Sequence, residues 1–209
     1  MSSNIDNLGP EYEDLVGWKD FHPDDLWVLD KLILSTKLGY KCGPRGLPVP
    51  NPSNYIIRPI MNLMGMGDGA KFIYIEKDTA KVVPNGFFWC EKFEGKHLSI
   101  DYVDGKQVLC LEGLKMPGDP IWKWKEWRKS SECVPFPSIL LPVKSRYRHF
   151  NIEMIGDKII EVHIRLNPNW RHGDYESALP VFWGDDVECP PGYTYVEDSN
   201  EYRRGFFFK

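Results

Sequence analysis

The residues with the clearest potential for chemistry lie close together, in the segment 149–169. They are two carboxylates, an imidazole and a guanidinium: Glu153, Glu161, His163 and Arg165. Two carboxylates that face each other can hold Mg²⁺, which proteins usually bind through one or two carboxylates together with nucleotide phosphates. Without a cation the two charges repel each other. The alternative is an ordinary solvated face of an antiparallel sheet.

The spacing predicts a β-hairpin that turns at Gly156-Asp157, because strand-like runs lie on both sides. We expect a three-residue loop, 156–158, which places Glu153 opposite Glu161 and puts Ile159 on their face. A shift by one residue would bury both carboxylates. Their repulsion must then be offset by a cation or by Arg165. The expected apolar face consists of Phe150, Ile152, Met154, Ile160, Val162 and Ile164.

Length and composition indicate one large or two small domains with a sizeable core, since the chain has 209 residues. With 26 basic and 30 acidic residues the net charge is −4, so no nucleic-acid partner is expected. The five cysteines form no CxxC pair, which argues against a zinc ribbon and a disulfide framework. No signal peptide and no membrane span are visible, so we expect a cytoplasmic protein without a membrane partner.

The elements that must position these residues begin with a helix near Leu26, capped by Asp24 or Asp25 and ending at Gly39. Lys31 lies within this helix. Its expected apolar side consists of Leu26, Leu29, Leu32 and Ile33.

A glycine-rich loop follows a strand that carries Arg58. The glycines are Gly65, Gly67 and Gly69, and a second strand follows at 71–76. Such a loop can cover a phosphate, because glycine lets backbone N–H groups approach an anion closely. The alternative is a flexible hairpin, and the glycine pattern taken by itself favours this alternative. It is neither a Walker A loop nor a dinucleotide fingerprint, since it lacks the GK[ST] ending and no helix follows.

Two further features lie downstream, a tryptophan-rich segment and the chain after Asn169. Trp122, Trp124 and Trp127 could stack a base or a sugar, although such residues more often form a packing surface. We expect Trp122 and Trp124 on one face of an extended segment. The chain after Asn169 is expected to be a tail that packs by its aromatic side chains and carries no chemistry.

The order of these pieces resembles the ATP-grasp family, especially its biotin-carboxylase-like branch of carboxylate–amine ligases. Asp30-Lys31 resembles that family's Asp-Lys segment, and Ile56-Ile57-Arg58-Pro59 resembles its phosphate-binding strand, with Arg in place of Lys. The three glycines fall where the family has its phosphate lid. Glu91-Lys92-Phe93 and the strand from His97 are similar to its adenine-binding hinge. The resemblance covers about residues 26–170.

The hairpin completes the resemblance, because its four functional residues match the family's Glu…Glu-x-Asn-x-Arg ending. One departure is His163, which stands where the family has Asn. An imidazole suits Zn²⁺ or Mn²⁺ better than Mg²⁺, so the metal could be either Mg²⁺ or Mn²⁺. Arg58 in place of Lys is milder, since both residues bind phosphate.

The resemblance implies a role for each matching residue. Lys31 and Arg58 would hold the phosphates of ATP, and the loop with Gly65, Gly67 and Gly69 would close over them. Main-chain groups near Glu91, Lys92 and Phe93 would read the adenine, with His97 beside it. Glu153, Glu161 and His163 would hold the metal, and Arg165 would steady an acyl phosphate. Lys31, Arg58 and Arg165 are the expected catalytic residues.

The implied fold is α+β, with antiparallel sheets, few helices and two small subdomains around a nucleotide cleft. We expect a surface segment (1–25), a smaller subdomain (26–103), a larger one (104–170) and a tail (171–209). Few residues precede Lys31, so we expect the acceptor site to be missing, supplied by a partner protein, or built from the tail.

The expected function is an ATP-dependent ligase that joins a small-molecule carboxylate to an amine or similar nucleophile. A non-catalytic nucleotide-binding domain and a Trp-rich β module for sugar or nucleic acid are the alternatives.

Overall fold

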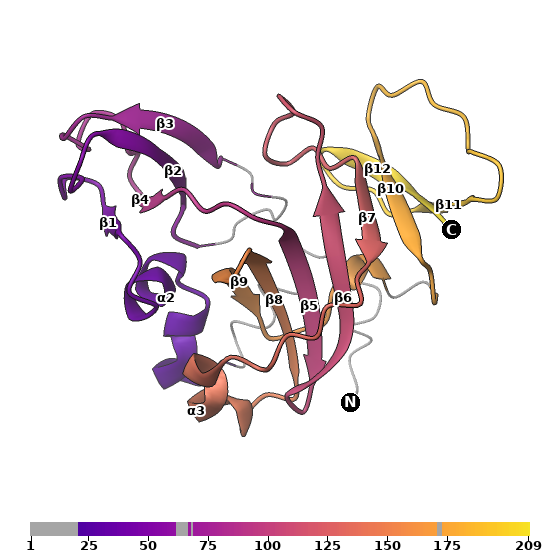
Figure 1. The fold of residues 1–209 in the computed structure, drawn as a ribbon, viewed down its shortest axis with the longest axis horizontal. Helices are drawn as coiled ribbons and strands as arrows, with labels where there is room; N and C mark the ends of the chain where they lie inside the picture. The colour runs from indigo at the N-terminus through magenta and orange to yellow at the C-terminus, as the bar shows by residue number, and fades with distance from the viewer. Residues whose placement is uncertain (1–20, 62–66, 68, 171–172) are drawn as a thin grey trace.

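The computed structural model describes residues 21–61, 67, 69–170 and 173–209. Its strands form two antiparallel sheets joined by the segment between β4 and β5 (Figure 1). The smaller sheet has the order β1-β4-β2-β3, with strands β1 (Cys42–Pro44), β2 (Ser53–Pro59), β3 (Lys71–Ile75) and β4 (Phe87–Glu91). The larger has the order β11-β12-β10-β7-β6-β5-β8-β9, with strands β5 (His97–Val103), β6 (Lys106–Leu114), β7 (Glu126–Lys129), β8 (His149–Ile155), β9 (Lys158–His163), β10 (Ser177–Phe182), β11 (Thr194–Glu197) and β12 (Arg203–Phe208). The fold is therefore α+β, as predicted.

Helices are few and short. Among the described residues none is long and apolar enough to cross a membrane. They are η2 (Pro23–Val28), α2 (Lys31–Lys37), η3 (Ser138–Leu140), α3 (Leu141–Lys144) and η4 (Pro168–Trp170). Helices α2 and α3 lie beside the larger sheet in Figure 1, where they help to cover its main apolar cluster. The fully buried members of that cluster include Leu34, Ile100, Tyr102, Leu140, Phe150 and Ile152.

The helix near Lys31 begins later than the sequence suggests. Residues 23–28 form a 3₁₀ helix, and α2 starts at Lys31, where the Asp30 side chain caps it by accepting a 2.7 Å hydrogen bond from the Ile33 amide. The expected apolar side is also wrong, since Leu26 and Ile33 are exposed and Leu34 is buried. The reason is Asp25, whose buried carboxylate pairs with Arg146 and so belongs to the interior rather than to a cap.

The smaller sheet separates two kinds of side chain by the alternation of its strands. Tyr55, Ile57 and Trp89 point into its own apolar cluster. Ile56 and Arg58, between and after them on β2, instead line a cavity that the sheet shares with the larger one. The alternation thus delivers Arg58 to the space between the sheets.

The β8–β9 hairpin does place Glu153 opposite Glu161, but by another route than the expected three-residue loop. The turn has two residues, since Ile155 pairs with Lys158, and Gly156 with φ +59° fits the first central position of a type II′ turn. A bulge then adds one residue to β9 and restores the register, because Met154 pairs with Ile159 and Glu153 with Glu161.

The bulge exchanges two isoleucines relative to the prediction. Ile159 joins the apolar cluster of the larger sheet, and Ile160 lines the cavity. Two identical neighbouring side chains cannot show in a hydrophobic pattern which of them points to the main cluster. Ile160 is buried, as expected, but it lies against the cavity rather than in that cluster.

The turn of this hairpin packs directly against the segment that joins the two sheets. The Gly156 amide donates a 2.8 Å hydrogen bond to the Lys96 carbonyl. A Cβ built on Gly95 would lie 2.8 Å from Gly156 Cα, and one built on Gly156 would lie 2.8 Å from the Glu94 carbonyl oxygen. Only glycine permits this approach of two backbones.

The sheets divide the chain at residues 92–96, not after residue 103, because β5 is a central strand of the larger sheet. The segment 171–209 is also more than a tail. It contributes β10, β11 and β12, and its Phe206 and Phe208 form an apolar cluster with Leu111 and Trp170. The segment packs through aromatic side chains, as expected, but it also adds three strands to the larger sheet.

Candidate functional site

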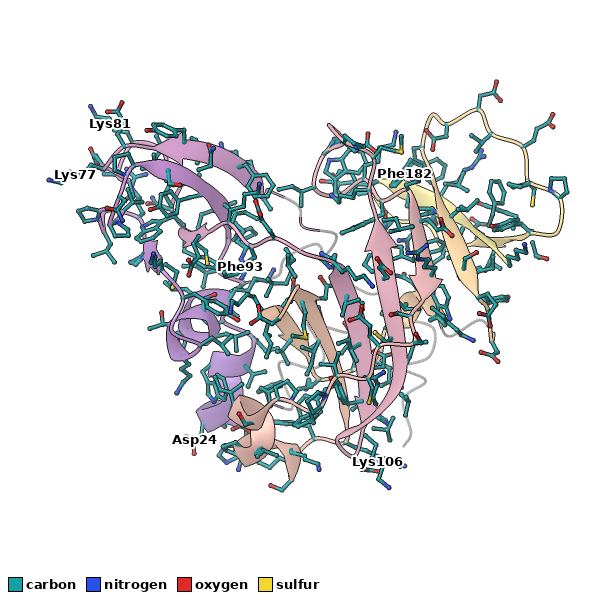
Figure 2. All side chains as sticks on the ribbon, in the orientation of Figure 1. Asp24, Lys77, Lys81, Phe93, Lys106 and Phe182 are labelled. Atoms are coloured by element: carbon teal, nitrogen blue, oxygen red, sulfur yellow. The ribbon has the colours of Figure 1, made fainter. Side chains whose placement is uncertain are left out.

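A cavity of about 780 Å³ lies between the two sheets. Figure 2 labels Phe93, from the joining segment, and Phe182, from β10, and both line it. Its walls also include Lys31, Arg58, His97, Glu153, Glu161, His163 and Arg165. Residues that lie far apart in the sequence, on α2, β2, β5, β8 and β9, thus meet in one space.

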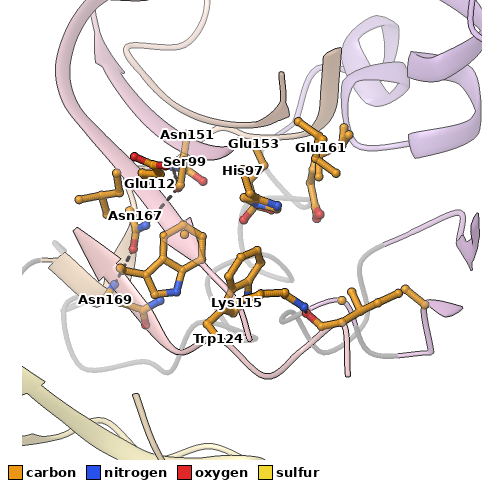
Figure 3. A pocket seen from close by; sticks show the side chains of 18 of the residues that line it. His97, Ser99, Glu112, Lys115, Trp124, Asn151, Glu153, Glu161, Asn167 and Asn169 are labelled. Atoms are coloured by element: carbon orange, nitrogen blue, oxygen red, sulfur yellow. Dashed lines mark hydrogen bonds and ion pairs between the residues drawn. The ribbon is translucent and has the colours of Figure 1, made fainter. Parts of the chain in front are cut away.

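The facing carboxylates each contact a basic side chain from another element. Lys31 Nζ lies 3.1 Å from Glu161 Oε1, and His97 Nε2 lies 3.2 Å from Glu153 Oε2. Figure 3 shows His97 and Glu153 together, with Glu161 beside them. Lys31 and His97 therefore both help to offset the repulsion across the hairpin. The guanidinium of Arg165 lines the cavity and donates a 3.3 Å hydrogen bond to the Leu166 carbonyl.

Glu153 is ionised over a wide pH range. Burial raises the pKa of its carboxyl, but the hydrogen bond from His97 and the positive charges of His97, His163 and Lys31 outweigh burial and lower the pKa to about 2. The side chain is 29% exposed, and it faces the cavity. A negative charge is thus available there at neutral pH.

Arg58 is a buried cation without enough partners. Its Nε and Nη2 are buried and hydrogen-bond to no other described residue, while the guanidinium stacks over the Phe88 ring at 5.2 Å. Burial lowers the pKa of this group, although Glu161 and Glu153 nearby raise it. An unpaired buried donor costs about 1–3 kcal/mol, more when it is charged. Arg58 therefore has guanidinium nitrogens that can donate to an anion in the cavity.

Four polar residues at the cavity floor form a network that the sequence did not suggest. Asn151 Nδ2 donates to Asp101 Oδ1 at 2.8 Å and to Ser99 Oγ at 2.9 Å. Asn167 donates its backbone amide to Asp101 at 2.9 Å. Its Nδ2 donates to Ser99 at 3.2 Å (Figure 3). The network fixes the chain directly after Arg165. Its only signal in the sequence is the polar alternation of β5 and β8, which is also typical of a solvated face.

Asp101 is the buried centre of this network. Burial raises the pKa of its carboxyl to about 6, although the hydrogen bonds from Asn151 and Asn167 and the charges of Arg165 and His163 lower it in part. The carboxylate thus titrates close to neutral pH within contact of the functional hairpin.

The tryptophan-rich segment divides between packing and the cavity. Trp122 stacks on Tyr202 with ring centroids 5.1 Å apart, whereas Trp124 and Trp127 line the cavity. Both of the latter contact the His97 ring, at 4.6 and 5.6 Å. Trp122 and Trp124 therefore do not share a face, because residues 121–125 turn instead of extending.

Comparison with solved structures identifies the fold. A protein from Archaeoglobus fulgidus described as belonging to the ATP-grasp superfamily superposes with a TM-score of 0.52 at 15% identity, over 87% of this chain and 64% of that one. This chain has an ATP-grasp fold. More distant matches are N5-carboxyaminoimidazole ribonucleotide synthetase from Thermotoga maritima, with a TM-score of 0.49 at 12% identity over 98% and 74% of the two chains, and D-alanine–D-alanine ligase from Bacillus anthracis, with a TM-score of 0.36 at 14% identity over 66% and 57%. No family model matches the sequence, and no curated protein is significantly similar to it.

The chain spans about 64% of the length of the Archaeoglobus structure. At such low sequence identity the likeness concerns the fold alone. Roles of individual residues in this ATP-grasp fold must therefore be argued from its own geometry.

The residues expected to bind nucleotide are only partly brought together by the ATP-grasp fold. Lys31, Arg58, Gly67, Phe93 and His97 line the cavity. Gly69 lies near it, with φ +72°, and its Cα faces the Phe87 ring. The side chains of Glu91 and Lys92 line a separate, polar pocket, and Glu91 Oε1 accepts a 2.8 Å hydrogen bond from the Lys41 amide. Gly65 lies outside the described residues. That main-chain groups at 91–93 read adenine stays a prediction.

The expected metal ligands fit a magnesium ion that shares its coordination with phosphate. Within the described part of the chain, no group of three or more His, Cys, Asp or Glu side chains could hold a metal ion. Glu153 and Glu161 remain as a facing pair, and Mg²⁺ commonly takes one or two carboxylates and completes its shell with water and phosphate. His163 Nε2 lies 3.4 Å from Glu161 Oε1, and its role as a ligand stays a prediction.

Proposed function

We propose that this chain binds ATP between its sheets and uses it to activate a carboxylate for attack by an amine or similar nucleophile. One observation carries the proposal. A buried guanidinium, that of Arg58, has two nitrogens without a hydrogen-bond partner among the described residues, and it lines the same cavity as the facing carboxylates Glu153 and Glu161. Donors for phosphate and ligands for its counter-ion are what phosphoryl transfer requires of a protein.

The reaction would run in two steps. A carboxylate oxygen of the substrate attacks the γ-phosphorus of ATP, and the bond to the bridging oxygen of ADP breaks, which gives an acyl phosphate. An amine then attacks the acyl carbon, inorganic phosphate leaves, and the amine loses a proton. Arg58 binds phosphate oxygens, and Arg165 orients the acyl phosphate. Mg²⁺, when bound by Glu153 and Glu161, would neutralise charge on the phosphates.

Lys31 has a different part in this proposal from the one expected. Its ammonium is engaged with Glu161, so it orients that carboxylate in the free protein. A phosphate that enters the cavity would compete with Glu161 for Lys31, and a Mg²⁺ ion on Glu161 would release the lysine towards the phosphate.

The test is thermal stabilisation by Mg²⁺–ATP, measured on the wild type and on Arg58→Met. We expect ATP to stabilise the wild type and to lose at least tenfold in affinity for the variant. The free variant should melt no lower than the wild type, because the substitution removes a buried unpaired charge. Arg45→Met is the matched control, since that arginine is on the surface and donates to the Val83 carbonyl.

Catalysis is tested separately by trapping an acyl phosphate with hydroxylamine, which converts it to a hydroxamate. ATP binding without ADP release for any carboxylate would support a non-catalytic nucleotide-binding domain instead. Failure of ATP to stabilise the wild type would contradict both proposals.

A further inference from the structure

Part of the same cavity has aromatic walls, formed by residues other than those of the proposed phosphate site. We call this the aromatic arm. It is lined by Trp124, Trp127, Trp170, Pro180 and Phe206, which come from the segment before β7, from β7 itself, from η4, and from β10 and β12. Trp124 and Trp127 contact each other with ring centroids 4.7 Å apart. The segment expected to be an inert tail therefore builds one wall.

The aromatic arm begins next to the reacting end of the cavity. Trp124 packs against His97 at 4.6 Å, and His97 in turn contacts Glu153 at 3.2 Å. A ligand against Trp124 thus lies one side chain away from a proposed metal ligand. Asn167 and Asn169 continue the lining from there (Figure 3).

The charged groups of the aromatic arm are already engaged. Arg203 Nη2 lies 3.4 Å from Asp198 Oδ2 and donates to Asn169 Oδ1 at 3.0 Å. Glu112 Oε2 lies 3.1 Å from Arg128 Nη2. Lys115 donates to the backbone carbonyls of residues 120 and 121, and its ammonium lies 4.5 Å from the Trp124 ring centre. A ligand here meets aromatic faces and charged groups that already have protein partners, which favours an uncharged body.

One buried donor points to a specific polar feature of that ligand. Trp170 is 8% exposed, and its Nε1 is buried without a hydrogen-bond partner among the described residues. Indole N–H groups in protein interiors usually find a partner. Since Trp170 lines the cavity, a ligand bound there can supply an acceptor atom to this donor.

We infer that the aromatic arm binds the body of the carboxylate substrate, and that this substrate is an aromatic carboxylic acid with a hydrogen-bond acceptor on its ring. Its carboxylate would lie towards Arg165 and the phosphate site, and its ring against Trp124 and Trp127. The acceptor would reach Trp170 Nε1. This inference rests on the proposed function and adds the class of substrate to it.

The experiment is a calorimetric titration with three probes: 4-hydroxyphenylacetate, phenylacetate and succinate. Each is titrated with and without a saturating non-hydrolysable ATP analogue and Mg²⁺. We expect 4-hydroxyphenylacetate to bind more tightly than phenylacetate, and succinate to bind least. Equal or tighter binding of succinate, or no binding of either aromatic acid in both conditions, would overturn the inference.

Three variants locate the binding. Trp124→Ala should weaken both aromatic acids by about tenfold, because it removes a stacking surface. Trp27→Ala is the matched control and should leave binding unchanged. That indole is half-buried and packs on the main apolar cluster of the larger sheet, outside the cavity. Trp170→Phe keeps an aromatic ring at this position but removes the donor, so it should weaken 4-hydroxyphenylacetate more than phenylacetate.

The result is separable from the fate of the proposed function. Stabilisation by Mg²⁺–ATP is measured on the same variants and should survive Trp124→Ala. Loss of ATP stabilisation in the wild type, with aromatic acids still bound, would contradict the ligase proposal and leave the aromatic arm as a binding site. Intact ATP binding with equal affinities in Trp124→Ala and Trp27→Ala would contradict the aromatic arm alone.

Discussion

Lys31 Nζ and Glu161 Oε1 lie 3.1 Å apart, and the two side chains are only 6% and 13% exposed. The first residue of α2 thus neutralises a carboxylate on β9, the second strand of the hairpin. A buried ion pair of this kind contributes little by itself, but the loss of one partner leaves the other charge buried and unpaired.

We therefore expect Glu161→Gln to destabilise the free protein, which is the opposite of what repulsion between two glutamates alone would give. The loss should be about 3 kcal/mol, because Lys31 keeps its charge inside the protein. For a chain of this size that corresponds to a fall in melting temperature of roughly 6–12 °C. Calorimetry on the metal-free protein measures it.

The double variant Lys31→Met/Glu161→Gln is the control for that prediction, because it removes both charges. It should regain most of the stability and none of the Mg²⁺-dependent ATP binding. If Glu161→Gln melts at or above the wild-type temperature, the ion pair is not formed in solution.

His97→Ala should change how stability depends on acid. The folded-state pKa of Glu153 is about 2, below its ordinary value of 4.5. Ionised Glu153 therefore stabilises the fold above pH 4.5, and this stabilisation is lost as the pH falls from 4.5 towards 2. Without His97, burial raises the pKa. The difference in unfolding free energy between wild type and variant should be largest above pH 4.5 and shrink below it.

Urea titrations over that pH range measure this difference. His149→Ala, at an exposed position at the start of β8, is the matched control and should show no such trend. A constant difference between wild type and His97→Ala would mean that His97 supports Glu153 only by packing.

Asp101→Asn should act in a higher pH range and with the opposite sign. The folded-state pKa of Asp101 is raised to about 6, above the ordinary 3.8. Its contribution to stability is therefore complete below pH 3.8 and is lost as the pH rises through 6. The wild type should gain stability relative to Asp101→Asn on acidification across this range. Equal pH profiles for the two proteins would show that Asp101 titrates normally.

Gly95→Ala should be costly, because both the backbone angle and the space oppose it. Gly95 has φ +123°, and a Cβ there would lie 2.8 Å from Gly156 Cα. Gly86→Ala is the control, since Gly86 has φ +78° but nothing within 4 Å of its Cβ. It should lose about 1 kcal/mol from the backbone angle alone, and Gly95→Ala at least twice as much. Equal losses would mean that the two backbones separate at little cost.

The sequence was sufficient for the fold and for the facing glutamates, because both depend on patterns within short segments. The alternation along residues 149–163 corresponds to β8 and β9, and the strands expected before and after the glycine loop are β2 and β3. The wrong turn length did not matter, since the bulge at Ile160 restored the register.

What could not be predicted depends on contacts between distant segments. Lys31 reaches Glu161, and Asp25 reaches Arg146, across more than a hundred positions of the sequence. The same holds for the wall that β10 and β12 add to the cavity, where aromatic residues look alike whether they pack or line a site. A residue pattern describes one segment of the chain at a time, whereas each of these features is formed by two segments that are distant in the sequence.

The contact of Gly95 with Gly156 is the point at which the joining segment meets the hairpin. Residues 92–96 connect the sheet of Arg58 to the sheet of Glu153 and Glu161, and they rest on the very tip of the hairpin that carries both carboxylates. A tilt of the smaller sheet about this point would change the distance from Arg58 to the two carboxylates. The pairing of β8 with β9 would keep Glu153 opposite Glu161. The sheet that carries Arg58 and the hairpin that carries both glutamates therefore meet at two residues without side chains.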